Sequence, residues 1–139
     1  MKKAVAYCRT ACGAQGDRLA GLRAQTDAIG RYAKEHGLTV LETYKDVGVS
    51  GATLNRPQLR KLIADCRAGK VGTVLTPDPD RLSRDLPQLL AILQMFQTEG
   101  VRLEFVTETG RVQYALHHIV VRALAEFRER KSKDRRRRV

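Results

Sequence analysis

Short apolar runs alternate with longer amphipathic stretches along most of this chain, and that alternation limits the fold more than any other feature. The short runs are rich in Val, Thr and Tyr, which favour strands, and the longer stretches carry apolar residues at helical spacing. Strands separated by helices form mainly parallel sheets that helices cover on both faces. We therefore predict an α/β fold with a mainly parallel sheet of four to five strands. The expected strands are residues 4–8, 38–44, 71–76 and 101–107, and the expected helices are residues 19–36, 57–66 and 86–97.

A length of 139 residues is enough for one domain. The net charge of +11 points to a polyanionic partner. Residues 131–139 contain six basic residues and one acidic residue, a net charge of +5, which leaves +6 of the +11 for the first 130 residues. Aromatic residues make up only 5% of the chain, so stacking on bases is a poor explanation for this excess. Contact with the phosphate backbone of a nucleic acid explains it better.

The three cysteines, Cys8, Cys12 and Cys66, form neither a zinc-binding pattern nor an even disulfide set. We expect Cys8 and Cys66 to be small buried side chains. No signal peptide opens the chain and no apolar run reaches membrane-spanning length, so we expect a cytoplasmic protein without membrane contact. Neither a metal ion nor a cofactor is predicted.

The segment Asp80-Arg81-Leu82-Ser83-Arg84 places a carboxylate and two guanidinium groups between an expected strand and an expected helix. Arg81 and Arg84 are three residues apart, so they share a face if the segment is helical. Two such groups on one face suit a phosphate. The alternative is an exposed helix start with a solvated ion pair, which is common and weak.

The carboxyl ends of parallel strands meet at one edge of a sheet, and open α/β folds bind ligands there. The loops after the first three expected strands carry four arginines and two aspartates, which this geometry brings together. Such a cluster suits in-line displacement at a phosphodiester, where arginines stabilise the added negative charge. The six residues are Arg9, Asp46, Arg56, Asp80, Arg81 and Arg84.

The order and spacing of these motifs resemble those of the serine site-specific recombinases, the resolvase and DNA invertase family. The likeness rests on Tyr-x-Arg at residues 7–9, Asp-x-Gly-x-Ser-Gly at 46–51, Arg-Pro at 56–57 and the segment at 80–84. It covers residues 4–108, and more loosely extends to 130. It implies a three-layer α/β/α domain that forms dimers, and tetramers when two sites pair. It also implies cutting and rejoining of duplex DNA through a covalent phosphoserine link, without ATP or metal.

The resemblance also implies a role for each matched residue. Arg9, Arg56, Arg81 and Arg84 would hold the scissile phosphate. Asp46 and Asp80 would orient these arginines or assist proton movement, and Gln25 would help to position the phosphate. The other residues implied in DNA or phosphate binding are Tyr7, Gln15 and Ser50.

The nucleophile is where this chain departs from the family. The family usually has Tyr-x-Arg-x-Ser, but Ala11 stands at the position of the serine, and a methyl group cannot attack phosphorus. Cys12 takes the role of nucleophile only if the loop bends, because a shift of one residue along an extended chain reverses the side chain. Nearby arginines would then lower the pKa of its thiol. The alternatives are that Cys12 is a spectator in a domain that binds without cutting, or that the active site is engineered or decayed.

Two further departures affect recognition and geometry. The chain ends at Val139 without the DNA-binding module that follows in the family, so sequence-specific recognition is expected to be weak, supplied elsewhere or lost. Pro77 and Pro79 stiffen the approach to Asp80, where the family has plainer residues, and leave the pose of Asp80 open.

The last amphipathic stretch predicts a helix over residues 111–133, which follows the domain at 1–110 and precedes a basic tail at 134–139. This helix is longer than a small domain can cover, so its apolar stripe favours a two-fold homodimer. The alternative is a helix that docks on its own sheet and frays into the tail. The stripe consists of Leu116, Ile119, Val120, Ala123, Leu124 and Phe127.

Three functions remain open from the sequence. The first is the catalytic domain of a serine recombinase with a substituted nucleophile. The second is an inactive module of the same fold that dimerises, binds DNA or regulates an active partner. A small-molecule enzyme fits less well, because no Gly-rich phosphate turn follows the first strand.

Overall fold

A parallel sheet of four strands, in the order β2-β1-β3-β4, forms the centre of the protein in a computed structural model that describes residues 2–10, 15–48 and 56–137. The predicted α/β fold with a parallel sheet is therefore confirmed. The strands are β1 (Lys2–Arg9), β2 (Leu38–Asp46), β3 (Thr73–Thr76) and β4 (Arg102–Phe105).

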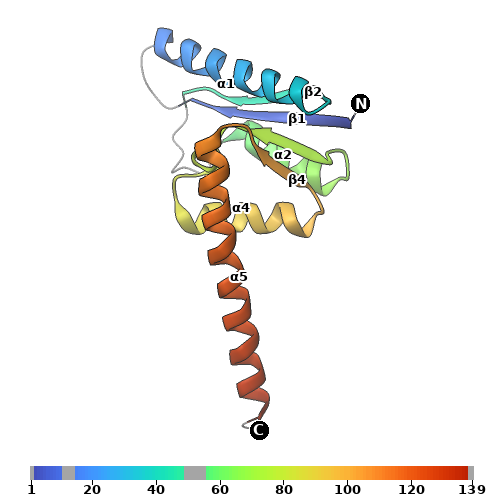
Figure 1. Ribbon diagram of the computed structural model, residues 1–139, viewed down its shortest axis with the longest axis vertical. Coiled ribbons are helices and arrows are strands. Elements are labelled where there is room, and N and C mark those ends of the chain that lie inside the picture. Colours follow the sequence, from blue (N-terminus) through green and yellow to red (C-terminus); the bar gives the residue numbers. More distant parts are fainter. Residues whose placement is uncertain (1, 11–14, 49–55, 138–139) are drawn as a thin grey trace.

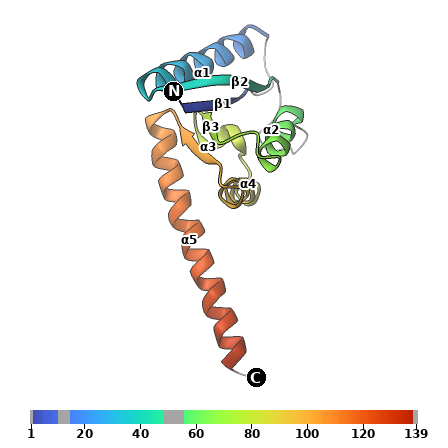
Figure 2. The ribbon, with the colours of Figure 1, turned by 90° about the vertical axis from the view of Figure 1, so that its right-hand side faces the viewer.

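Helices cover both faces of this sheet, as a three-layer fold requires. Figures 1 and 2 show α1 on one side and α2 and α4 on the other, with a long α5 leaving the domain. The helices are α1 (Gln15–Glu35), α2 (Pro57–Arg67), α3 (Pro79–Leu82), α4 (Leu86–Thr98) and α5 (Glu108–Arg137).

The side chains of β1 alternate between two apolar cores, and this alternation sets the direction of Arg9. Ala6 and Cys8 pack in the smaller core, beneath Ile29 of α1. Val5 and Tyr7 pack in the larger core with residues of α2 and α4. Because side chains two apart in a strand point the same way, Arg9 lies on the face of Tyr7, toward α2 and α3.

Cys8 and Cys66 are buried, as predicted from the sequence. Burial raises the pKa of each thiol to about 11. Both therefore stay protonated and belong to the two cores.

The short helix α3 was not predicted, and it changes the expected geometry of the segment 80–84. It ends at Leu82, and Ser83 has extended backbone angles of φ −166° and ψ 146°. Arg81 therefore lies in a helical turn while Arg84 lies beyond it. Arg81 and Arg84 therefore do not share the face of one helix, as they would if the whole segment were helical.

Helix α5 begins beside the sheet and extends away from it (Figure 1). In its first turns Tyr114 packs against Phe105, with ring centroids 5.0 Å apart. The helix continues to Arg137, so residues 134–137, expected in a basic tail, are helical. None of the helices in the described part of the chain is long and apolar enough to cross a membrane.

Candidate active site

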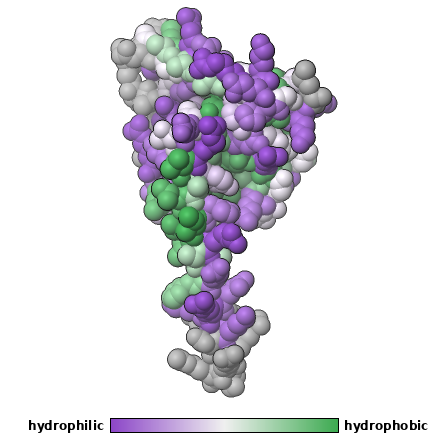
Figure 3. Space-filling view, in the orientation of Figure 1, coloured by the Kyte–Doolittle hydropathy of each residue, from purple (hydrophilic) through white to green (hydrophobic). Residues whose placement is uncertain are grey.

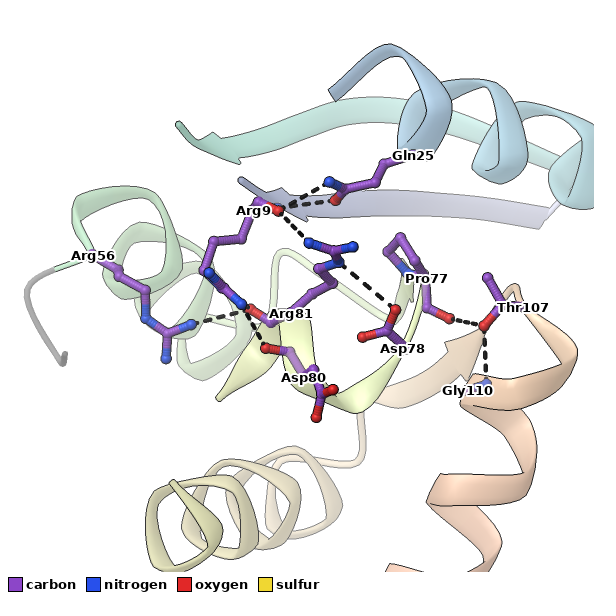
Figure 4. Close-up of polar contacts among 9 residues, drawn as sticks. All are labelled: Arg9, Gln25, Arg56, Pro77, Asp78, Asp80, Arg81, Thr107 and Gly110. Carbon is purple, nitrogen blue, oxygen red and sulfur yellow. Dashed lines mark hydrogen bonds and ion pairs between the residues drawn. The ribbon is translucent and has the colours of Figure 1, made fainter. Parts of the chain in front are cut away.

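Three arginines from three different elements meet at the carboxyl edge of the sheet (Figure 4). Arg9 is the last residue of β1, Arg56 is the N-cap of α2, and Arg81 lies in α3. Arg9 and Arg56 are 0% exposed. Buried arginines are rare and need partners, so their contacts indicate what the site is built to hold.

Backbone carbonyls hold the three guanidinium groups. The carbonyl oxygen of Arg81 accepts hydrogen bonds from Nε of Arg9 at 3.2 Å and from Nη1 of Arg56 at 3.1 Å. Nη2 of Arg9 donates to the carbonyl of Asp80 at 2.9 Å, and Nη1 of Arg81 donates to the carbonyl of Arg9 at 3.1 Å. Carbonyl oxygens orient the groups without neutralising their positive charges.

The electrostatics of the cluster favour an added anion. Burial lowers the pKa of the Arg9 guanidinium, and the positive charges of Arg84, Arg81 and Arg56 lower it further. Nε and Nη2 of Arg56 are buried and have no hydrogen-bond partner among the described residues. Donors left in this way cost free energy until an acceptor reaches them. A phosphate oxygen is such an acceptor, and its negative charge would balance the positive charges of the guanidinium groups.

Asp46 fixes the start of α2 and thereby the backbone of Arg56. Its carboxylate accepts hydrogen bonds from the Tyr7 hydroxyl at 2.8 Å and from the backbone amides of Gln58 and Leu59, both at 3.0 Å. These amides belong to the first turn of α2, whose N-cap side chain makes no capping bond. Asp46 therefore caps the helix from the end of β2, and it orients Arg56 through the helix.

Tyr7 and Gln25 hold other residues of the site in place through buried hydrogen bonds. Burial, and then the negative charge of Asp46, raise the pKa of the Tyr7 hydroxyl, so it stays a donor in its bond to Asp46. Gln25 accepts from the amide of Arg9 at 3.1 Å and donates to its carbonyl at 2.9 Å. Both side chains are buried, and their hydrogen bonds hold Asp46 at the end of β2 and Arg9 at the end of β1. A direct contact of either side chain with phosphate stays a prediction.

The structure gives the remaining predicted residues different positions. The side chains of Asp80 and Arg84 are exposed, and Figure 4 shows the Asp80 carboxylate pointing away from the guanidinium groups. Asp80 reaches Arg9 through its backbone carbonyl instead. Cys12 and Ser50 lie outside the described residues, as does Ala11. Gln15 begins α1, and its side chain also lies outside the description.

Sequence reasoning missed Arg18 of α1, which lies at the same edge. A Cβ added to Gly48 would lie 2.7 Å from Nη1 of Arg18, so the guanidinium packs directly on this glycine, whose φ is +71°. Arg18 falls in the polar first turn of α1 with no motif around it, so the sequence pattern did not mark it. Among the described residues, no group of three His, Cys, Asp or Glu side chains is placed to hold a metal ion.

The fold and the arginine cluster together define an α/β domain with three arginines at the carboxyl edge of its sheet, where open α/β folds bind ligands. Residues 4–139 match the family described as "Resolvase, N terminal domain", and the chain belongs to that family. The recognition made from the motifs is thereby confirmed.

Similar proteins agree with this assignment. The chain is 36% identical over 93 residues to the transposon Tn21 resolvase of Escherichia coli, which covers 67% of the chain and 48% of the resolvase. It is 30% identical over 135 residues to a protein of Bacillus subtilis (strain 168), covering 93% of the chain and 26% of that protein. The chain thus spans half or less of the curated relatives it matches.

Two solved structures cover nearly the whole chain. The N-terminal catalytic domain of TP901-1 integrase has a TM-score of 0.74 at 28% identity, over 94% of this chain and 99% of that one. A resolvase family site-specific recombinase from Streptococcus pneumoniae has a TM-score of 0.71 at 27% identity, over 97% and 93%. The long helix is therefore included in the similarity.

Proposed function

We propose that residues 1–110 form the catalytic domain of a serine-type DNA recombinase, in which the arginine cluster binds the scissile phosphodiester of duplex DNA. The observation that carries this proposal is the buried Arg56, which lies beside Arg9 and Arg81 and has two nitrogen atoms without a hydrogen-bond partner among the residues that the structure describes. The names of the relatives, which include a resolvase and the catalytic domain of an integrase, support the same activity.

The described residues supply binding and charge stabilisation in this reaction. Arg56 donates to a non-bridging phosphate oxygen, and Arg9 and Arg81 neutralise the charge that grows as a nucleophile adds to phosphorus. If Cys12 is the nucleophile, its sulfur loses a proton and bonds to phosphorus, the bond from phosphorus to a deoxyribose oxygen breaks, and that oxygen leaves with a proton. The protein then holds the DNA end as a phosphorothioester. The same steps in reverse rejoin the strand without an external energy source. Asp46, Tyr7 and Gln25 keep the arginines in place.

One observation favours a second function, a binding module that does not cut DNA. Ala11 has no group that can attack phosphorus, and it stands where the family has its serine. The arginine cluster would then hold DNA, and either an active partner would cut it or no cleavage would take place.

The register of the nucleophile separates these two functions. We expect strand cleavage to be absent or very slow in the unmodified chain. Ala11→Ser and Cys12→Ser, each joined to a matched DNA-binding module, are tested for covalent protein–DNA adducts on nicked or supercoiled DNA by mass spectrometry. One variant and not the other should form an adduct, because the attacking atom must lie in line at about 3 Å.

The control adds Arg84→Ala to the active variant and should abolish the adduct. If neither serine forms an adduct while Arg81 and Arg84 still bind phosphate, the catalytic proposal fails and the binding module stands.

We also propose that residues 111–133 form a dimerisation helix, and that pairing of two DNA sites joins dimers into a tetramer. Large apolar side chains of this helix are 44% to 64% exposed, and Figure 3 shows apolar surface along one side of the protruding helix. A contiguous exposed stripe of this kind marks an interface. The exposed residues are Val112, Leu116, Ile119, Val120, Leu124 and Phe127.

Charged residues in this stripe should break the dimer without unfolding the sheet. Val120→Glu with Leu124→Glu is expected to give a monomer in sedimentation at high micromolar concentration. Arg122→Glu changes the net charge by the same two units on another side of the helix, so it should remain dimeric. A monomeric unmodified chain at that concentration would contradict the dimer.

A further inference from the structure

Asp78 has a carboxylate that its local structure does not use. It is the N-cap of α3, in extended conformation, yet its side chain makes no capping hydrogen bond. Pro79 follows and has no amide hydrogen to offer. Oδ1 of Asp78 is buried and has no hydrogen-bond partner among the described residues. Capping therefore does not explain a carboxylate at this position.

The other oxygen of Asp78 faces the arginine cluster. Oδ2 lies 3.7 Å from Nε of Arg81, and the two side chains are 23% and 31% exposed. This distance is close enough for charge attraction and too long for a hydrogen bond. Nη1 of Arg81 points to the carbonyl of Arg9, so Arg81 lies between a carboxylate and the cluster (Figure 4). Backbone carbonyls, in contrast, receive the hydrogen bonds of Arg9 and Arg56.

The start of α5 holds Asp78 in this place. The Thr107 hydroxyl donates to the carbonyl of Pro77 at 2.8 Å, and the amide of Gly110 donates to that hydroxyl at 2.9 Å. A Cβ on Gly110 would overlap the Pro77 carbonyl oxygen and lie 2.9 Å from Cα of Asp78. Because the start of α5 fixes the backbone at residues 77–78, the carboxylate of Asp78 stays close to the guanidinium of Arg81.

We propose that Asp78 is an internal counter-ion of Arg81, which competes with phosphate for the guanidinium and so lowers the affinity of the arginine cluster for its anion. This inference rests on the proposed function, because it assumes that phosphate binds there. Asp78 acts through Arg81 and is a positioning residue that sets affinity. The cluster then binds phosphate less tightly than its three arginines would without Asp78.

Asp78→Asn tests this inference because asparagine keeps the shape of the side chain and removes its charge. Binding of inorganic phosphate is followed in NMR titrations through the Nε–H signal of Arg81. We expect the dissociation constant to fall about two- to fivefold, the range of a partly exposed ion pair. Asp27→Asn removes the same charge from an exposed position of α1 and should leave the constant unchanged. Asp78→Ser serves as a second variant if the asparagine impairs folding.

A double-mutant cycle locates the effect at Arg81. In an Arg81→Ala background, followed through the Nε–H signal of Arg9, Asp78→Asn should bring no gain, because the competing pair is gone. The inference is overturned if both Asp78 variants bind phosphate no more tightly than the unmodified chain. It is also overturned if Asp78→Asn raises phosphate affinity equally in the Arg81→Ala background. Either result leaves the proposed function in place. If neither the unmodified chain nor the variants bind phosphate, the proposed function falls and the inference falls with it.

Discussion

Replacing Asp46 with alanine is expected to lower the free energy of unfolding by about 3–5 kcal/mol, as the loss of a buried charged acceptor with several donors does. Asp46 is 3% exposed, and its carboxylate accepts three hydrogen bonds. Its removal leaves the buried Tyr7 hydroxyl and two amides of α2 without an acceptor. Urea unfolding followed by circular dichroism measures the change.

Two further variants show how much of the effect of Asp46→Ala comes from one hydrogen bond and how much from the loss of any carboxylate. Tyr7→Phe removes one donor and leaves the cap of α2 intact, so it should cost about 1 kcal/mol. Asp27→Ala removes an exposed carboxylate and should cost less than about 0.5 kcal/mol beyond the change in helix propensity. Equal losses for Asp46→Ala and Asp27→Ala would show that Asp46 does not hold α2.

Replacing Gly110 with alanine is expected to destabilise the protein by about 2–3 kcal/mol, the cost of forcing extra volume into a packed region. The new Cβ would overlap the carbonyl oxygen of Pro77 and lie 2.7 Å from the Thr107 hydroxyl. Backbone rather than a flexible side chain stands in the way. The start of α5 therefore has to move away from the segment that carries Asp78 and Arg81.

Gly30 provides a matched control because it also lies inside a helix. A Cβ at Gly30 meets nothing within 4 Å, so Gly30→Ala should stabilise the protein by up to about 1 kcal/mol through helix propensity. Thermal unfolding of the two variants should therefore shift in opposite directions. A stabilising effect of Gly110→Ala would contradict the tight contact between α5 and residues 77–78.

The approach of Arg9, Arg56 and Arg81 was predictable because it depends on one global property, the parallel direction of the strands. Once the apolar runs indicate a parallel sheet, the ends of its strands have to share an edge. The functional motifs then assign the arginines to that edge. No long-range contact has to be known in advance.

The detailed contacts were not predictable, because they join residues far apart in sequence. Nothing in the local pattern indicates that Gln25 bonds the backbone of Arg9, or that Asp46 caps α2. The helix α3 has four residues between two polar segments, too few for periodicity to register. The end of α5 was missed because lysine and arginine suit both a helix and a solvated tail.

The affinity of a short DNA duplex for a small set of variants tests most directly whether the arginine cluster binds a phosphodiester. Arg81→Ala and Arg84→Ala should each weaken binding by about 1–3 kcal/mol, as expected for a hydrogen bond to a charged group. Arg67→Ala is the control, because this exposed arginine lies at the far end of α2 from Arg56 and should change affinity little. If Arg81→Ala and Arg84→Ala leave affinity unchanged while deletion of residues 134–139 abolishes it, the basic end of the chain and not the cluster binds DNA.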